Sequence, residues 1–502
     1  MGSLRWASAV LVCVGLMLGV TPGQAADGPA LSASSVIARD ALLSDATLLQ
    51  EAYESLHPGL YRYNTGEQMD AHFAALRQSL GRDQTLAEAY LAFSLFAAQV
   101  RCGHTYPNFY NQPKAHRLAL FEQGSARVPF HFRWVDGRMV VLRDLTGRGL
   151  LPAGSVVHSI EGVDSGEILA SMMRIARADG GNDAKRRSLL EVRGLDEYET
   201  FDIYLPLLFP QVDAQIELGV RVPGHTDPTT VAVIGHSFAQ RQATRAERPE
   251  GDTAGWTFDA SSLQLAVLKM PGWALYNSSW DWKGFLREAF ETLAQREVQA
   301  LVIDLRGNEG GLDVGEEIIP YLLERELRIS APAARVRYRR VPDALVPALD
   351  TWDRTFDDWG AAAVRHDERF FNLLRWRTST TVTIQPRAPR FRGRVFVLVG
   401  ADNSSATFQF VQQLQQSGLA TLVGQPTGGN QRGINGGAFY FLRLPGSGIE
   451  LDLPLIATFP AGDPPDAGLQ PDLVVEPDVD DIARGRDVEM DAVRQALSAS
   501  SP

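Results

Sequence analysis

Lysine is scarce in this 502-residue chain. Only four of its 48 basic residues are lysines (Lys114, Lys185, Lys269 and Lys283), and none follows Lys283. The formal net charge is −12 and no long basic run occurs, which argues against a nucleic-acid partner. Any chemistry that depends only on residues after Lys283 must therefore do without a lysine amine.

Cysteine is rarer still, because Cys13 and Cys102 are the only two in the chain. Cys13 lies in an N-terminal apolar run that we expect to be removed, which leaves Cys102 alone. A single cysteine excludes an internal disulfide and a thiolate-rich zinc site. No oxyanion-forming pattern surrounds Cys102, so a role as nucleophile is disfavoured.

Long hydrophobic runs are missing after the first 25 residues. Arg5 precedes a short apolar run, and Gly23 and Ala25 supply the small residues of a cleavage site after Ala25. This pattern predicts a signal peptide over residues 1–25; the alternative, a membrane anchor, would need a longer run. We therefore expect a periplasmic or secreted protein with no integral membrane segment after signal removal.

Hydrophobic periodicity divides the rest of the chain into three parts. Residues 26–125 have helical spacing, and "TLAE" from Thr85 is a capping box that opens a helix. Residues 126–255 have the alternation and turn signals of a β-rich region. Residues 256–502 alternate strands with helices, interrupted by a charged and aromatic insertion at about 325–390. The pattern predicts an α/β protein with a helical N-terminal domain.

Two adjacent serines lie in "VLVGADNSSATFQF", residues 397–410, between a predicted strand and a predicted helix. Ser404 suits the N-cap position, where a hydroxyl accepts a backbone hydrogen bond. Ser405 would begin the helix, beside unpaired N–H groups and the positive end of the helix dipole. Read alone, the segment is also consistent with two serines that only cap the helix and have no catalytic role.

A glycine-rich loop follows the buried strand in "LVIDLRGNEGG", residues 301–311. Such a loop can present backbone N–H groups to an anion. The lysine and hydroxyl of a phosphate-binding P-loop are missing, so phosphate binding is disfavoured. A simple glycine turn is the alternative, and Asp304 with Arg306 is predicted to be a structural pair that shapes the loop.

Two further motifs follow in order, "LVGQPTGGN" at 422–430 and "GLQPDLVV" at 468–475. Together the four motifs resemble the C-terminal-processing (tail-specific) serine peptidase family, which includes tricorn-type peptidases and the interphotoreceptor retinoid-binding protein. The resemblance implies a ββα-type (crotonase/ClpP-like) catalytic core, a PDZ-like middle region and a peptide or protein substrate. It also implies that neither a metal ion nor an organic cofactor is used.

The resemblance assigns Ser405 as the nucleophile, with an oxyanion hole formed by the N–H groups of Ala406 and of Gly310 or Gly311. Many family members take their base from a lysine immediately after the Gly-x-Pro-Thr-x-Gly turn. Asn430 stands at that position here.

The tricorn-like branch instead takes a histidine from the N-terminal region, and "CGHTY" offers His104 as the general base. Gly103 replaces the serine that precedes the histidine in that branch. The branch also has a late glutamate that this chain lacks, so Asp463 or Asp466 is the expected substitute. Arg432 and Asn430 are the candidate substrate-binding residues, with Arg432 placed to hold a substrate carboxylate, although a solvated loop arginine is the alternative.

Two functions therefore follow from the sequence. The first is an exported serine endopeptidase that uses Ser405 and His104. The second is a non-catalytic peptide- or ligand-binding protein on the same fold, which the two departures from the usual relay favour.

Overall fold

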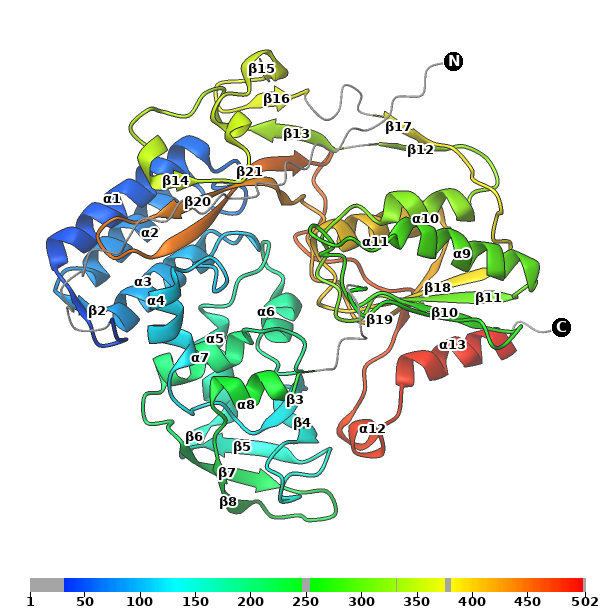
Figure 1. Cartoon of the computed structure of the whole chain (residues 1–502), viewed down its shortest axis with the longest axis horizontal. Helices are drawn as coiled ribbons and strands as arrows, with labels where there is room; N and C mark the ends of the chain where they lie inside the picture. The colour runs from blue at the N-terminus through cyan, green and yellow to red at the C-terminus, as the bar shows by residue number, and fades with distance from the viewer. Residues whose placement is uncertain (1–30, 246–252, 331, 375–380, 500–502) are drawn as a thin grey trace, which may run out of the picture. The chain divides into compact units, whose positions relative to one another are not determined.

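A computed structural model describes residues 31–245, 253–330, 332–374 and 381–499 of the chain (Figure 1). The predicted signal peptide lies outside the described residues. Among these residues no helix is both long enough and apolar enough to cross a membrane. The mixture of helices with parallel and antiparallel sheets confirms the predicted α/β class.

Three helices form most of the N-terminal part: α1 (Arg39–Leu56), α2 (Gly66–Ser79) and α3 (Leu86–Gln99). The predicted capping box at Thr85 is confirmed. Its side chain accepts the N–H of Glu88 at 3.2 Å, and the Glu88 carboxylate accepts the N–H of Thr85 at 2.8 Å. The chain leaves α3 in an irregular loop that carries His104.

The middle part is built on an antiparallel sheet in the order β3-β4-β5-β7-β8. Its strands are β3 (Phe130–Val135), β4 (Arg138–Asp144), β5 (Val156–Ile160), β7 (Gln215–Arg221) and β8 (Thr229–Ile234), and the short β6 (Val163–Asp164) pairs with β5. The accompanying helices are α5 (Ser165–Met173), α6 (Asp183–Leu189), α7 (Thr200–Leu208) and α8 (Phe238–Ala243).

A buried ion pair joins the last two of these helices. The guanidinium of Arg241 in α8 donates to both carboxylate oxygens of Asp202 in α7, at 2.7 and 3.1 Å. Both side chains are almost fully buried. Because the two buried charges are bonded to each other, the pair fixes α8 against α7.

A second sheet has the order β22-β19-β18-β11-β10-β9, and all neighbours are parallel except β9. Its strands are β9 (Thr257–Asp259), β10 (Ala266–Lys269), β11 (Ala300–Asp304), β18 (Arg394–Val399), β19 (Thr421–Gly424) and β22 (Leu473–Val474). All residues of β11 are buried, as expected of a parallel strand covered on both faces.

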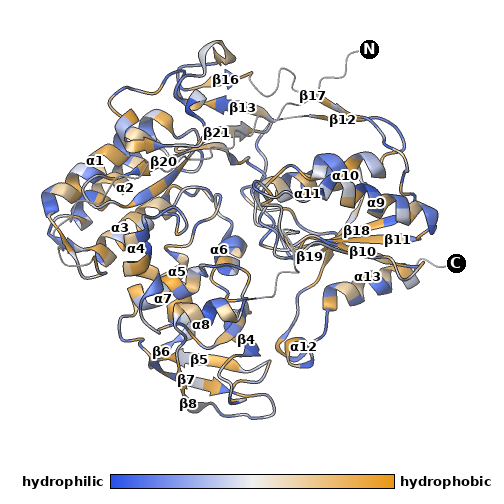
Figure 2. Ribbon diagram, viewed as in Figure 1, coloured by the Kyte–Doolittle hydropathy of each residue, from blue (hydrophilic) through white to orange (hydrophobic). Residues whose placement is uncertain are grey.

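Helices cover both faces of this parallel sheet (Figures 1 and 2). Leu301, Ile303 and Val397 face one core, with α9 (Trp282–Gln295), α10 (Gly315–Leu322) and α11 (Ser405–Ser417). Val302 and Phe396 face the other core, with α13 (Val488–Ser498). The loops at the carboxyl ends of β11 and β18 hold the glycine-rich loop and the two serines, where open parallel sheets place their sites.

A third sheet combines strands from the 325–390 segment with two long later strands. Its order is β14-β20-β21-β13-β16-β15. The strands are β13 (Ala333–Val336), β14 (Leu349–Asp350), β15 (Ala363–Arg365), β16 (Phe371–Leu373), β20 (Asn435–Arg443) and β21 (Glu450–Phe459). A separate ribbon pairs β12 (Leu327–Ser330) with β17 (Thr381–Ile384). The segment is thus tied by β-pairing to strands that follow Ser405.

Candidate active site

Ser405 is the first residue of α11 and has an unusual backbone conformation. Its φ is +51°, in the left-handed region that L-residues other than glycine rarely occupy. The preceding loop is held by Asn403, whose side-chain amide donates to the carbonyls of Leu305 and Asn308 at 2.7 and 3.0 Å. The conformation of Ser405 is therefore imposed by the packing of two loops against each other.

The glycine-rich loop contacts Ser405 directly. A Cβ added to Gly310, where φ is +109°, would lie 2.9 Å from Cβ of Ser405 and 3.0 Å from the N atom of Ala406. One added to Gly311, where φ is +138°, would lie 2.2 Å from the carbonyl oxygen of Trp273. Both glycines are thus required by backbone conformation and by close approach.

The N–H groups of this loop are not equally engaged. The N–H of Gly310 donates to the side-chain oxygen of Asn308 at 2.9 Å. The bridge to Trp273 uses the N–H of Leu312, at 2.9 Å, and not that of Gly311. The N–H of Ala406 lies in the first turn of α11, where no intrahelical acceptor exists.

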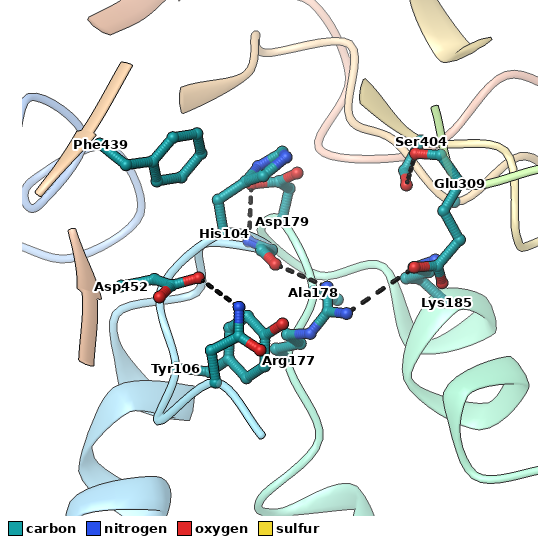
Figure 3. Close-up of a pocket in the computed structure, with 13 residues that line it drawn as sticks. His104, Tyr106, Arg177, Ala178, Asp179, Lys185, Glu309, Ser404, Phe439 and Asp452 are labelled. Carbon is teal, nitrogen blue, oxygen red and sulfur yellow. Dashed lines mark hydrogen bonds and ion pairs between the residues drawn. The ribbon is translucent and has the colours of Figure 1, made fainter. Parts of the chain in front are cut away.

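A cavity of about 220 Å³ has Ser404 in its wall, whereas Ser405 is not among the residues that line it (Figure 3). Its walls include His104, Tyr106, Arg177, Asp179, Lys185, Glu309, Ser404, Phe439 and Asp452. Ser404 occupies the N-cap position of α11, as predicted, but its hydroxyl makes no capping bond. It donates instead to the carbonyl oxygen of Glu309 at 3.1 Å, which links the serine loop to the glycine-rich loop.

His104 reaches the cavity from the loop after α3. Its ring centroid lies 5.8 Å from that of Phe439, and its Nδ1 is buried without a hydrogen-bond partner among the described residues. Burial lowers the pKa of His104, and the positive charge of Arg177 adds to that effect, while Asp179 opposes it. The imidazole is therefore neutral at neutral pH, the form that can accept a proton.

Asp179 is fixed at the residue next to His104. Its Oδ1 accepts the N–H of Gly103 at 2.9 Å, and a Cβ added to Gly103 would lie 3.1 Å from its Oδ2. Arg177 donates to the carbonyl oxygen of Gly103 at 2.8 Å and stacks 4.3 Å from the ring centroid of Tyr106. The 177–179 segment thus holds the histidine loop, and no motif in the sequence pointed to it.

Lys185 in α6 also lies in the cavity, although it is far from the serines in sequence. Its side chain is only 3% exposed and donates to the Glu309 carboxylate at 2.5 Å and to the carbonyl oxygen of Asp402 at 3.2 Å. Burial raises the pKa of Glu309, but Lys185 and Arg177 outweigh it, so the net shift is downward. The cavity therefore contains a compensated pair of charges beside the glycine-rich loop.

Asp402 anchors the serine loop from the other side. Its carboxylate accepts two hydrogen bonds from Arg193, at 2.8 and 2.6 Å, and one from Ser188 at 2.7 Å. Burial raises the pKa of Asp402, but the positive charge and hydrogen bonds of Arg193 lower it by more than burial raises it. The carboxylate therefore stays ionised. This bidentate pair restrains the loop that leads into Ser405.

The two carboxylates predicted to orient the histidine have other partners. Asp466 accepts the amide of Asn430 at 2.7 Å and the N–H of Gly181 at 2.9 Å. Asp463 is 91% exposed and lies 3.5 Å from the guanidinium of Arg432. In this structure neither carboxylate is engaged with His104.

The side chains of Asn430 and Arg432 are also engaged within the protein. The buried Asn430 amide donates to the carbonyl oxygen of Asp179 at 3.1 Å as well as to Asp466. Arg432 donates through Nε to the carbonyl oxygen of Pro464 at 3.1 Å. Asn430 therefore connects the loop after the Gly-x-Pro-Thr-x-Gly turn to the segment that carries Asp179.

No group of three or more His, Cys, Asp or Glu side chains arranged to hold a metal ion is found in the described part of the chain. The cavity is instead lined by one neutral imidazole, paired acidic and basic groups and two aromatic rings. Such a set can move protons and bind a polar backbone.

Comparison with known proteins gives one family match and a set of similar folds. Residues 264–475 match the model of Peptidase family S41. None of the curated proteins compared with the chain matches it.

Among solved structures, mature CPAF complexed with lactacystin is 15% identical with a TM-score of 0.62, covering 91% of this chain and 98% of that chain. Mature CPAF alone is 15% identical with a TM-score of 0.61, covering 92% and 99%. The tricorn protease is 13% identical with a TM-score of 0.39, covering 91% of this chain and 36% of that chain. At these identities the likeness to CPAF shows the fold alone.

The family match spans the glycine-rich loop, both serines and the two later motifs in their order. Residues 264–475 are similar to Peptidase family S41, and this match indicates a serine-type peptidase.

Proposed function

We propose that the protein is an exported serine endopeptidase of the tricorn-like branch, with Ser405 as its nucleophile. The observation that carries the proposal is the left-handed φ of Ser405 at a strand-to-helix turn, against Gly310 and directly after Ser404, which lines the same cavity as His104. Strained conformations of this kind cluster at functional positions, and a sharp turn exposes a nucleophilic hydroxyl. Peptides and proteins are the substrates.

His104 is the proposed general base. It takes the proton of Ser405 during attack on the peptide carbonyl, returns it to the leaving amine, and then activates the water that hydrolyses the acyl-enzyme. Its lowered pKa and its unpartnered Nδ1 support this role. Lys185 is the rival base, but its ammonium already donates to two oxygens, and we assign it to holding Glu309.

Asp179, rather than Asp463 or Asp466, is the proposed carboxylate that positions the base. Its carboxylate is bonded to the N–H of Gly103, and its charge acts on the His104 imidazole. A nearby carboxylate stabilises the imidazolium that forms during catalysis. Asp466 and Asn430 then support Asp179 indirectly, because the Asn430 amide donates to the carbonyl oxygen of Asp179 and to Asp466.

Ala406 and Gly311 are the proposed oxyanion donors in this conformation. The Ala406 N–H begins a helix, and the bridge between the glycine-rich loop and Trp273 does not use the Gly311 N–H. Gly310 is not a proposed donor, because its own N–H donates to Asn308; its role is to leave room, without a side chain, next to the Ala406 N–H. Removal of one such donor typically costs about 100- to 1,000-fold in rate.

The finer architecture is part of the same proposal. We assign residues 26–125 to a helical domain, 126–255 to a PDZ-like domain and 256–502 to a crotonase/ClpP-like catalytic domain. The parallel order of β10, β11, β18 and β19 and the antiparallel sheet of the middle part are compatible with those folds. Export to the periplasm or the medium rests on the N-terminal sequence pattern alone.

One observation favours the second function, a non-catalytic binding protein on this fold. The N–H of Gly310 is already satisfied by Asn308, so one of the two predicted loop donors is not free for an oxyanion. A binding protein would need no such donor. The same experiment separates both functions.

That experiment is labelling of the purified protein with a serine-directed fluorophosphonate. The adjacent serine supplies a matched control: we expect labelling of the wild type and of Ser404→Ala, and none of Ser405→Ala. Lactacystin, present in one of the CPAF structures, is a second probe that should compete with the label. No labelling of a folded wild type, or labelling that survives in Ser405→Ala, would refute the nucleophile.

A further inference from the structure

A cluster of aromatic rings runs outward from the cavity along β20. Ala438, Tyr440 and Leu442 of this strand are buried, whereas the alternate residues Phe439 and Phe441 are only partly buried. Period-two alternation places these two rings on the opposite face from the core. This face therefore carries apolar side chains where a polar pair would be usual.

Trp352 completes the cluster from the other side of the β14–β20 pairing. Its ring centroid lies 6.0 Å from that of Phe439, 5.9 Å from Phe441 and 5.6 Å from Phe356. Phe356 and Trp359 are buried in the core below, but Trp352 remains 61% exposed. The exposed indole and the two partly exposed rings beside it form an apolar patch. Apolar patches on a protein surface are typical of binding sites.

The cluster is continuous with the cavity. Phe439 belongs to both, because it lines the cavity and its ring faces His104 at 5.8 Å (Figure 3). Gly436 extends the contact, since a Cβ added there would lie 4.0 Å from the His104 ring. A peptide bound in the cavity would therefore have Phe439, and through it Trp352, within reach of one of its side chains.

We infer that Phe439, Trp352 and Phe441 form a subsite that binds an aromatic or large aliphatic side chain of a peptide substrate. This deepens the proposed function and rests on it, because the cavity of His104 supplies the place of the reacting bond. The occupant follows from the chemistry: three ring faces offer dispersion and stacking contacts and no charge to pair with an acidic or basic side chain.

The size of the preference follows from burial of apolar surface. A large apolar side chain moved from water onto these rings should bind about 10- to 100-fold more tightly than glycine at the same position. Truncation of Trp352 to alanine removes the ring that contacts both Phe439 and Phe441, so most of that preference should disappear although those two rings remain. Trp352→Phe keeps a ring and should retain most of it.

The test measures binding without turnover. A Ser405→Ala protein is titrated with fluorescein-labelled decapeptides of Gly and Ser, in which one Phe, or one Asp as control, is moved along the chain. We expect tighter binding for Phe at one position only, and none of this gain for Asp. The gain should be lost in Trp352→Ala and kept in Ile234→Ala, a matched truncation of a 67% exposed apolar side chain on β8.

Three outcomes would overturn the subsite: equal affinities for all peptides, a Phe preference that survives Trp352→Ala, or self-association of the protein that depends on Trp352. Fluorophosphonate labelling of the protein with Ser405 intact is measured in parallel. Labelling without a Phe preference removes the subsite alone, whereas a Phe preference without labelling removes the nucleophile alone.

Discussion

Two glycines of one loop give a sharp test of the proposed oxyanion site. Gly307 and Gly310 both have positive φ, +84° and +109°, so an alanine at either position adopts a strained backbone. Their surroundings differ. A Cβ at Gly307 would lie 3.4 Å from a Leu195 methyl and 3.9 Å from the carbonyl oxygen of Pro271, whereas a Cβ at Gly310 would lie 2.9 Å from Cβ of Ser405 and 3.0 Å from the N atom of Ala406.

The two substitutions should therefore both destabilise the fold, Gly310→Ala more so because its Cβ also presses against Ser405 and Ala406, and they should differ sharply in their effect on activity. Left-handed or neighbouring backbone conformations cost a residue with a Cβ about 1–3 kcal/mol, which applies to both variants. Only Gly310→Ala brings a methyl group onto Ser405 and the Ala406 N–H. Loss of that donor predicts a further fall of about 100- to 1,000-fold in the rate of reaction at Ser405.

The assay is the second-order rate constant of fluorophosphonate labelling, which needs no knowledge of the natural substrate. Thermal unfolding of the same samples checks that both variants are folded. We expect Gly307→Ala to label within about threefold of wild type, because it leaves the donors in place. Equal rates for the two variants, or wild-type labelling of Gly310→Ala, would show that Gly310 does not border the oxyanion site.

Three further predictions concern the groups around this site and the middle part. Asp179→Asn removes the carboxylate that raises the pKa of His104, so the acidic limb of the labelling rate should move to lower pH; an unmoved limb contradicts that contact. Lys185→Met should lower the free energy of unfolding by about 1–3 kcal/mol, because its carboxylate partner loses its closest cation, and labelling should persist. If labelling instead vanishes in folded Lys185→Met, the lysine is the base. Asp202→Ala strands the buried Arg241 guanidinium and should cost about 3–5 kcal/mol in urea unfolding; a loss below 1 kcal/mol would refute the burial argument.

The parts of the structure that sequence analysis predicted are those with local causes. The capping box before α3 depends on residues three apart, and the burial of β11 follows from an unbroken apolar run. The pairing of Asp304 with Arg306, at 2.8 to 3.0 Å, joins side chains two residues apart. Each of these features is decided within a few residues, so the sequence is sufficient to predict it.

The groups that complete the cavity could not be predicted in this way. Lys185 is one of four lysines and carries no motif, and only the docking of α6 brings it to Glu309. Phe439 and Trp352 are separated in sequence and meet through the pairing of β14 with β20. Their positions are set by tertiary packing, which overrides any local pattern.

The departure at Gly103 illustrates how a sequence anomaly can have a structural cause. The resemblance to the tricorn-like branch made Gly103 an argument against the catalytic assignment, because a serine hydroxyl is expected beside the histidine. In the structure a side chain at this position would press against Asp179, whose carboxylate binds the Gly103 N–H. The absence of a side chain at position 103 thus makes room for the Asp179 carboxylate. A missing serine and a missing late glutamate are both accounted for if Asp179 holds His104, and Gly103→Ser should then impair the protein instead of restoring a lost contact.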